Sequence, residues 1–116
     1  KLDVNTLKFC SNEMIARIRK EIPLMNDIGS MDNTVPTNIQ LYRIYIERYL
    51  CYHPIVNKNL DLIISQKEPT QYGVPVEVYF FLSDKVWNEY EQIQSDIFDH
   101  LLVMVREFDL KLYQYS

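Results

Sequence analysis

The sequence has few of the residues on which several common functions depend. It holds only two glycines, Gly29 and Gly73, so a glycine-rich loop that cradles phosphate is excluded. Its two cysteines, Cys10 and Cys51, lie far apart and match neither a CxxC motif nor a dense disulfide framework. The residues around them form no recognisable catalytic signature. We therefore expect two buried, inert thiols in a reducing, cytosolic setting.

Long apolar runs and an excess of basic charge are also missing. No segment approaches the roughly 20 apolar residues that a membrane-spanning helix needs, and the first residues lack the apolar segment of a signal peptide. The 12 Lys and Arg are outnumbered by 16 Asp and Glu, which gives a formal charge of −4. This balance disfavours nucleic acid as a partner. Because the chain does not begin with Met, we expect it to be a piece of a larger protein.

The composition that remains is typical of one folded domain. The chain has 116 residues, of which 47% are hydrophobic and 24% charged, values close to those of globular domains with a single core. Nine Tyr stand against one Trp. Tyrosine rings are common where a core meets water or a partner subunit, so this content hints at an interface.

A short helix is predicted near the N-terminus. Ser11 is a favoured N-cap, and apolar side chains recur along one side of the residues that follow it. Pro23 ends this helix. Residues 23–36 hold two Pro, one Gly and several Asn, Asp and Ser, so we expect a loop. The apolar stripe of the helix consists of Met14, Ile15, Ile18 and Ile22.

Two longer helices are predicted further along the chain. Thr37 and Gln40 resemble a capping box before a helix that ends at His53. Asp84 is the expected cap of the last helix, which runs from about Lys85 to Phe108. The expected buried stripes are Ile39, Tyr42, Ile46, Tyr49 and Leu50 in the first helix and Val86, Tyr90, Ile93, Ile97, Leu101, Met104 and Phe108 in the second.

Four strands are predicted from the remaining segments. Residues 60–66 and 76–82 alternate between apolar and polar side chains, and the segment between them, with two Pro and one Gly, favours an antiparallel hairpin with a long tip. Residues 2–9 are rich in strand formers without clean alternation, and residues 110–115 close the chain as a last strand. The order of elements predicts an α+β fold, a ferredoxin-like split βαβ sandwich. Its four-stranded antiparallel sheet would carry two main helices on one face, with a short extra N-terminal helix.

Carboxylates and one of the two histidines gather on the last predicted helix. On a helical wheel, Glu89, Asp96 and His100 fall within a narrow sector, and these residue types can bind a divalent metal. They are spread over roughly 16 Å of helix, so only Asp96 and His100 could share an ion. An Asp–His pair on the solvent edge is favoured over a metal site. We expect no catalytic residue, metal or cofactor.

A set of short motifs runs through the chain from position 37 onward. Its members are Thr37, Asn38, His53, Pro54, Pro69, Thr70, Gly73, Pro75, Glu77, Trp87, Tyr90, Gln94 and Phe98. With the segments around them, they resemble the C-terminal cytoplasmic region of small-conductance mechanosensitive channels (the MscS family), especially its miniconductance-type branch. Residues 3–14 resemble the stretch that follows the β-domain of these channels. The resemblance thus covers most of the chain.

The resemblance implies a homo-oligomeric channel, a heptamer, that opens under membrane tension and releases solutes in hypoosmotic shock. Its transmembrane helices would lie upstream in the bacterial inner membrane, with this domain on the cytoplasmic side. Residues 1–22 would be the strand and short helix after the β-domain, 23–36 a loop, and 37–116 the rest of the α/β domain. This domain would form a vestibule wall that filters permeating ions and small solutes, and it would not be an enzyme. The residues expected to face the vestibule or a neighbouring subunit are Glu89, Asp96, Asp99 and His100.

One segment departs from the family pattern, and two other functions stay open. Members of the branch carry a longer charged insertion with basic residues ahead of Thr37, where this chain has the shorter segment 26–36. The main alternative is a ferredoxin-like regulatory domain that binds a small ligand at a dimer interface. A small metal-dependent or thiol enzyme is the third. Apolar segments of about 20 residues upstream, followed by a β-rich domain, would favour the channel.

Overall fold

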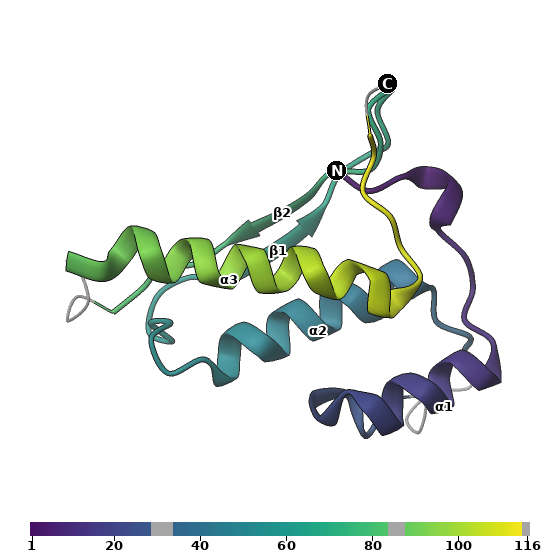
Figure 1. The fold of residues 1–116 in the computed structure, drawn as a ribbon, viewed down its shortest axis with the longest axis horizontal. Coiled ribbons are helices and arrows are strands. Elements are labelled where there is room, and N and C mark those ends of the chain that lie inside the picture. The colour runs from purple at the N-terminus through teal and green to yellow at the C-terminus, as the bar shows by residue number, and fades with distance from the viewer. Residues whose placement is uncertain (29–33, 84–87, 115–116) are drawn as a thin grey trace.

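A computed structural model describes residues 1–28, 34–83 and 88–114. The elements in chain order are α1 (Asn12–Glu21), α2 (Asn38–Tyr52), β1 (Ile63–Gln66), β2 (Val76–Tyr79) and α3 (Tyr90–Met104). Short 3₁₀ turns span Val4–Thr6, Pro23–Met25 and Val105–Phe108. Figure 1 shows α3 crossing in front of the β1–β2 hairpin and α2 running below α3, with both chain termini on the same side of the molecule.

The sheet in the described part of the chain has two strands. β1 and β2 pair antiparallel, with Ile63 opposite Tyr79 and Gln66 opposite Val76. Beyond the strands, the Lys67 N–H donates to the Pro75 carbonyl at 3.0 Å. The hairpin then closes in a turn over residues 70–73. The predicted antiparallel hairpin with a long tip is confirmed.

The predicted four-stranded ferredoxin-like sheet is wrong. Leu2 makes one isolated antiparallel bridge to Val74 and another to Leu112, and the segments around these bridges are not strands. In an extended strand over residues 2–9, the side chains of Leu2 and Val4 would point to one face and those of Leu7 and Phe9 to the other. No single register could bury both pairs, and the chain instead turns at residues 4–6. Residues 2–9 therefore contribute single bridges in place of a strand.

The segment predicted as the last strand is also too weakly covered to form one. Leu110 is buried, but Leu112 and Tyr113 are exposed, so no layer packs over the second apolar position. A strand gains most of its stability from packing on at least one face. Within residues 110–114, the described part of this segment, the bridge that forms joins Leu112 to Leu2.

The helices supply most of the core, largely as predicted. The Ser11 hydroxyl accepts from the Met14 N–H at 3.1 Å, and the Thr37 hydroxyl accepts from the Gln40 N–H at 3.2 Å, so both predicted N-caps are confirmed. The members of the predicted stripes that are buried are Met14, Ile18, Ile22, Ile39, Tyr42, Ile46, Leu50, Ile97, Leu101 and Phe108. Burying such side chains contributes roughly 1.5–3 kcal/mol each.

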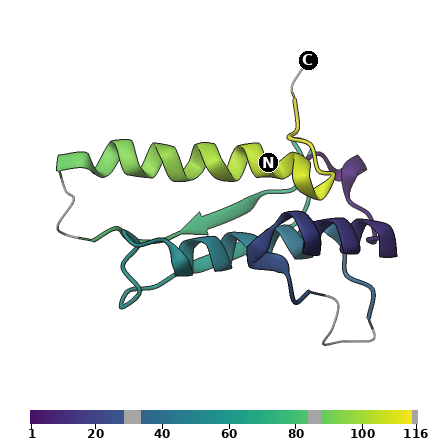
Figure 2. The same ribbon diagram turned by 60° about the horizontal axis from the view of Figure 1, so that its bottom comes forward.

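Helix α3 differs from the prediction at both ends. Tyr90, expected in the core, is 41% exposed, because the first turns of α3 extend past the end of α2 (Figures 1 and 2). The predicted cap Asp84 and the stripe residue Val86 lie outside the described residues. At the other end the α-helix stops at Met104, and its last turn tightens into the 3₁₀ turn before Asp109, whose φ is 56°.

The predicted loop between α1 and α2 is partly built into the core. After the 3₁₀ turn Pro23–Met25, both Met25 and Ile28 are buried. Arg48 of α2 donates to the Leu24 carbonyl at 2.7 Å and to the Asp27 carboxylate at 2.6 Å. The Arg48 hydrogen bond lowers the pKa of Asp27. Residues 23–28 therefore pack against α2.

Candidate functional site

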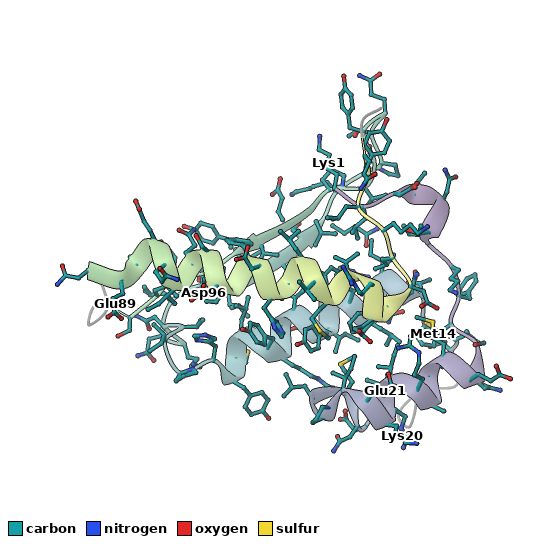
Figure 3. The ribbon with its side chains drawn as sticks, viewed as in Figure 1. Lys1, Met14, Lys20, Glu21, Glu89 and Asp96 are labelled. Atoms are coloured by element: carbon teal, nitrogen blue, oxygen red, sulfur yellow. The ribbon has the colours of Figure 1, made fainter. Side chains whose placement is uncertain are left out.

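The carboxylates predicted to carry function lie along the exposed side of α3. Glu89 immediately precedes the helix, and Asp96 and Asp99 lie within it; all three side chains are exposed. Figure 3 labels Glu89 and Asp96 toward the end of α3 that points away from the chain termini. The ion pairs found among the described residues include none of the three. Asp96 accepts a long hydrogen bond from the Gln92 side chain, at 3.4 Å. These residues form an acidic, hydrated face.

His100 is separate from this acidic face. Its Nε2 lies 2.5 Å from the Tyr45 hydroxyl, and its ring stacks on that of Tyr49 with centroids 4.2 Å apart. Burial raises the pKa of Tyr45 to about 12, so at neutral pH the hydroxyl is protonated and donates to the neutral imidazole. His100 is therefore held between α2 and α3, and the structure pairs it with tyrosines where the sequence favoured Asp96.

Sequence reasoning missed the cluster that contains His100. We call Tyr45, Tyr49, His53 and His100 the tyrosine–histidine cluster. Tyr49 stacks on Tyr45 at 6.0 Å and meets His53 edge-on at 5.8 Å. The signal in the sequence was the four-residue spacing from Tyr45 to Tyr49 and on to His53, which places three rings along one side of α2. Tyr45 is buried, and the cluster packs α2 against α3.

We expect the fold to lose stability as the pH falls below about 6.5, the unperturbed histidine pKa. Burial lowers the pKa of both His100 and His53, so the unfolded chain binds protons more readily than the folded one. The stability that this difference contributes is complete above the unfolded pKa and is lost as the pH falls through the folded pKa. Urea unfolding at a series of pH values between about 7.5 and 5 measures the loss.

The two histidines can be separated by substitution to glutamine, which does not titrate. His100→Gln and His53→Gln should each reduce the pH dependence, and the double variant should remove it in this window. Asp27 does not interfere, because its pKa is lowered from 3.8 and it titrates at more acidic pH. A double variant that keeps the full pH dependence would refute the assignment.

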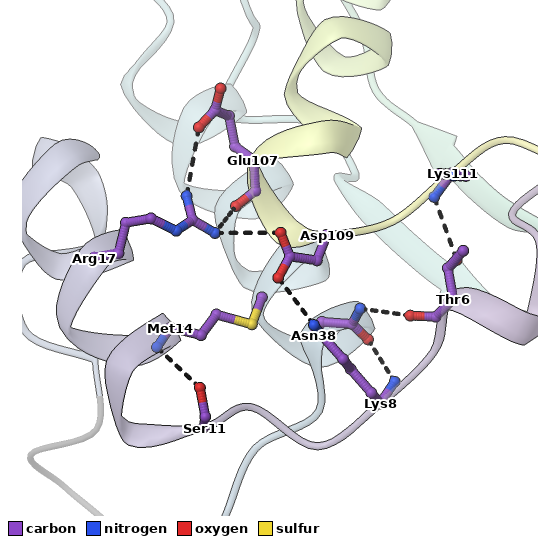
Figure 4. A network of polar contacts seen from close by, with 9 residues as sticks. All are labelled: Thr6, Lys8, Ser11, Met14, Arg17, Asn38, Glu107, Asp109 and Lys111. Atoms are coloured by element: carbon purple, nitrogen blue, oxygen red, sulfur yellow. Dashed lines mark hydrogen bonds and ion pairs between the residues drawn. The ribbon is translucent and has the colours of Figure 1, made fainter.

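Several motif residues connect separate segments of the fold through hydrogen bonds. Asn38, at 0% exposure, accepts from the Lys8 N–H at 3.1 Å and donates to the Thr6 carbonyl at 2.9 Å (Figure 4). Thr70 and Gly73 exchange two backbone hydrogen bonds, at 2.9 and 3.1 Å. His53 is the C-cap of α2, and its backbone N–H donates a hydrogen bond to the Leu50 carbonyl. Of the other motif residues, Pro54, Pro69, Glu77 and Tyr90 are exposed, Pro75, Gln94 and Phe98 are partly buried, and Trp87 lies outside the described residues.

A group of hydrogen bonds and ion pairs connects α1 to residues 107–109, which follow α3. Arg17 donates to the Glu107 carbonyl at 2.8 Å and lies 3.6 Å from the carboxylates of Glu107 and Asp109. The Lys8 ammonium lies 3.0 Å from the same Asp109 carboxylate (Figure 4). Partly exposed ion pairs of this kind contribute roughly 0–1 kcal/mol each to the free energy of unfolding. These contacts therefore fix the orientation of α1 more than they stabilise the fold.

The two cysteines differ in environment. Cys10 is buried as expected, and burial raises the pKa of its thiol. Cys51 is exposed, so its predicted burial is wrong. It directly follows the buried Leu50, and one step along a helix turns the side chain by about 100°, away from the stripe.

Comparison with known proteins leaves the family open. No protein-family model matches the chain, and no solved structure matches it.

Among the described residues, no three or more His, Cys, Asp or Glu side chains are grouped so that they could bind a metal ion. The helices in the described ranges are all too short or too polar to cross a membrane.

Proposed function

We propose that this chain forms part of the cytoplasmic vestibule wall of a homo-oligomeric, tension-gated channel of the bacterial inner membrane. The observation that carries the proposal is the long run of channel-like motifs, because several of its members have specific structural roles. Thr37 caps α2, the Asn38 side chain bridges the Lys8 N–H and the Thr6 carbonyl, and Gly73 has a positive φ in the hairpin turn. The proposal rests on these local features and not on the sheet topology.

The acidic face of α3 supports a role as a solute filter. Glu89, Asp96 and Asp99 are exposed and have no basic partner among the described residues, so their charge acts on the surrounding solution. Such a charge enriches cations within about one Debye length, ~8 Å at physiological salt. On the walls of a vestibule, it would favour cations over anions on their way to the pore.

The outer face of the hairpin supports assembly with other copies. Ile63 and Tyr79 lie opposite each other on β1 and β2 and are 49% and 52% exposed. The Tyr79 ring also meets Phe81 edge-on at 5.2 Å. Apolar and aromatic side chains gathered on one face are common in subunit contacts. A wall made of several copies would cover this face.

The proposal is tested on the parent protein that contains this chain. We expect it to restore survival of hypoosmotic shock to bacterial cells that lack their own mechanosensitive channels. Membrane patches from these cells should show currents that appear with suction. Normal expression in the membrane, without tension-gated current and without rescue, would overturn the proposal. The mass of the detergent-purified protein would give the number of subunits.

Neutralising the acidic face of α3 is expected to shift the selectivity of the channel toward anions. The variant combines Glu89→Gln, Asp96→Asn and Asp99→Asn, which remove charge and keep side-chain size. The reversal potential in a KCl gradient measures the shift. The matched control neutralises three exposed carboxylates outside α3, with Glu13→Gln, Asp61→Asn and Glu68→Gln. Normal currents with an unchanged reversal potential in the α3 variant would contradict the filter role.

A further inference from the structure

The outer edge of β1, on the side away from β2, has unpaired backbone groups. The bond from the Lys67 N–H to the Pro75 carbonyl shows that Lys67, and by alternation Ser65, directs its backbone groups toward β2. Ile64 and Gln66 therefore direct theirs away from β2. In the described ranges, no backbone hydrogen bond is made at this edge by either residue.

This edge lies on the far side of the hairpin from both chain ends. Leu2 pairs with Val74 on the free side of β2, and Leu112 pairs with Leu2 in turn. A strand that continued the pairing of Leu2 would therefore run along β2 and leave the outer edge of β1 uncovered. Natural edge strands often carry a charge or a proline that prevents pairing with another chain. β1 itself, with the sequence IISQ, has neither.

The charges that flank β1 are placed symmetrically about Ile64. Asp61 lies three residues before Ile64 and Lys67 three residues after it, and both side chains are exposed. Among the described residues, no ion pair includes Asp61. Lys67 lies 3.9 Å from the Glu77 carboxylate, a long and exposed contact that holds the lysine only weakly. If two β1 strands paired antiparallel with Ile64 opposite Ile64, Asp61 of each copy would lie opposite Lys67 of the other.

We propose that two copies of this chain pair through the outer edges of β1. The two strands run antiparallel about a two-fold axis at Ile64, so the two hairpins become one four-stranded sheet. Ile64 bonds with Ile64 of the second copy, and Leu62 with Gln66. An Asp61–Lys67 ion pair forms at each end. A two-fold contact uses the same surface on both copies, whereas a ring uses two different surfaces. The pairing therefore goes beyond the vestibule role and does not depend on it.

The charges favour this register over its neighbours. A shift of two residues in one direction would place Lys67 opposite Ile63 and Asp61 opposite Pro69, without an ion pair. The opposite shift would place Asp61 opposite Ser65, again without one. Opposite charges in facing positions stabilise a strand pair, so the register centred on Ile64 is preferred. A second copy supplies both charges at the required spacing, which makes the edge self-complementary.

Self-association of the 116-residue protein tests the proposal. Sedimentation equilibrium over a range of concentrations should show a reversible equilibrium between monomer and dimer. Hydrogen exchange at the Ile64 and Gln66 amides should slow as the dimer forms, because these N–H groups gain partners in the second copy. The Val76 and Val78 amides, which point to the other edge of the hairpin, should exchange at the same rate in monomer and dimer.

A charge swap separates the contact between copies from effects within one copy. Lys67→Glu should weaken the dimer about tenfold, because like charges then face each other at both ends. Adding Asp61→Lys restores opposite charges and should recover most of the affinity. Both variants lose the Lys67–Glu77 pair within the chain, so recovery reports only on the contact between copies.

The matched control is Lys20→Glu on α1, which makes the same change in net charge far from the hairpin (Figure 3). It should change the dimer affinity by less than about twofold, since salt screens distant charges. Circular dichroism checks that each variant is folded. A wild-type protein that stays monomeric at all concentrations, a dimer that leaves the Ile64 and Gln66 amides unprotected, or a double variant as weak as Lys67→Glu would each overturn the proposal.

Discussion

Gly73→Ala is expected to destabilise the fold by about 3 kcal/mol or more. Gly73 has a φ of +103°, a conformation that a side chain strains, and an added Cβ would lie 2.4 Å from the Leu2 carbonyl oxygen. That oxygen accepts the Val74 N–H at 2.7 Å, so relieving the clash would break the bridge between the N-terminus and the hairpin. Urea unfolding followed by circular dichroism measures the loss.

The matched control for this variant lies in the same turn. Gln71 is exposed at the tip of the hairpin, so Gln71→Ala should change the free energy of unfolding by less than about 0.5 kcal/mol. If Gly73→Ala were as harmless as this control, the close approach of Leu2 to the turn would be disproved. The comparison separates the backbone constraint at Gly73 from a general sensitivity of the hairpin.

Asn38→Ala is expected to cost about 2–4 kcal/mol of stability. The wild-type side chain is fully buried and satisfies the Lys8 N–H and the Thr6 carbonyl, at 3.1 and 2.9 Å. Removing it takes the partner from both part-buried backbone groups, roughly 0.5–1.5 kcal/mol for each hydrogen bond, and leaves a cavity where the buried side chain was. Thermal and urea unfolding of the purified variant measure the effect.

Two further variants test the hydrogen bonds themselves. Asn38→Asp keeps an acceptor for the Lys8 N–H but loses the donor to the Thr6 carbonyl and buries a charge, so it should also be strongly destabilising. Asn12→Ala, at an exposed position at the start of α1, is the control and should have little effect. If Asn38→Ala unfolded at the same urea concentration as the wild type, the two hydrogen bonds of Asn38 would contribute nothing to stability.

Features determined within a few residues were predictable from the sequence. The caps at Ser11 and Thr37 depend on a hydroxyl and an N–H three residues later, and both formed as expected. The hairpin followed from alternation on either side of a segment rich in turn residues. Helical stripes were reliable where another element covered them, and they failed at Tyr90, in the first turn of α3, which extends past the end of α2.

Features that depend on distant partners were not predictable in the same way. Strand propensity at residues 2–9 did not reveal that this segment would form isolated bridges, at Leu2 and Phe9, in place of a strand. The contact of His100 with Tyr45 joins two helices, and the Arg17–Asp109 pair joins the two ends of the chain. Periodicity describes one element at a time, so it cannot show which two elements will meet.

The candidate site was accordingly predicted in part. The wheel placed Glu89, Asp96 and His100 in one narrow sector that borders the apolar stripe, and the two carboxylates are exposed. His100 shares their segment and borders the stripe, but its side chain packs against α2. Burial at such a borderline position depends on the neighbouring helix, which the sequence of α3 does not specify.

The double bridge at Leu2 also bears on the order in which the molecule assembles. α1, α2 and the hairpin form through contacts between neighbours in the chain, whereas the bridge from Leu2 to Leu112 closes a loop that contains nearly all of it. Loop-closure entropy opposes such a contact until the intervening segments are compact. During synthesis, Leu2 can pair with Val74 long before Leu112 has been made. The N-terminal segment then has one of its two bridges until residues 110–113 follow. We therefore expect the Leu2–Leu112 contact to form last during folding and to open first.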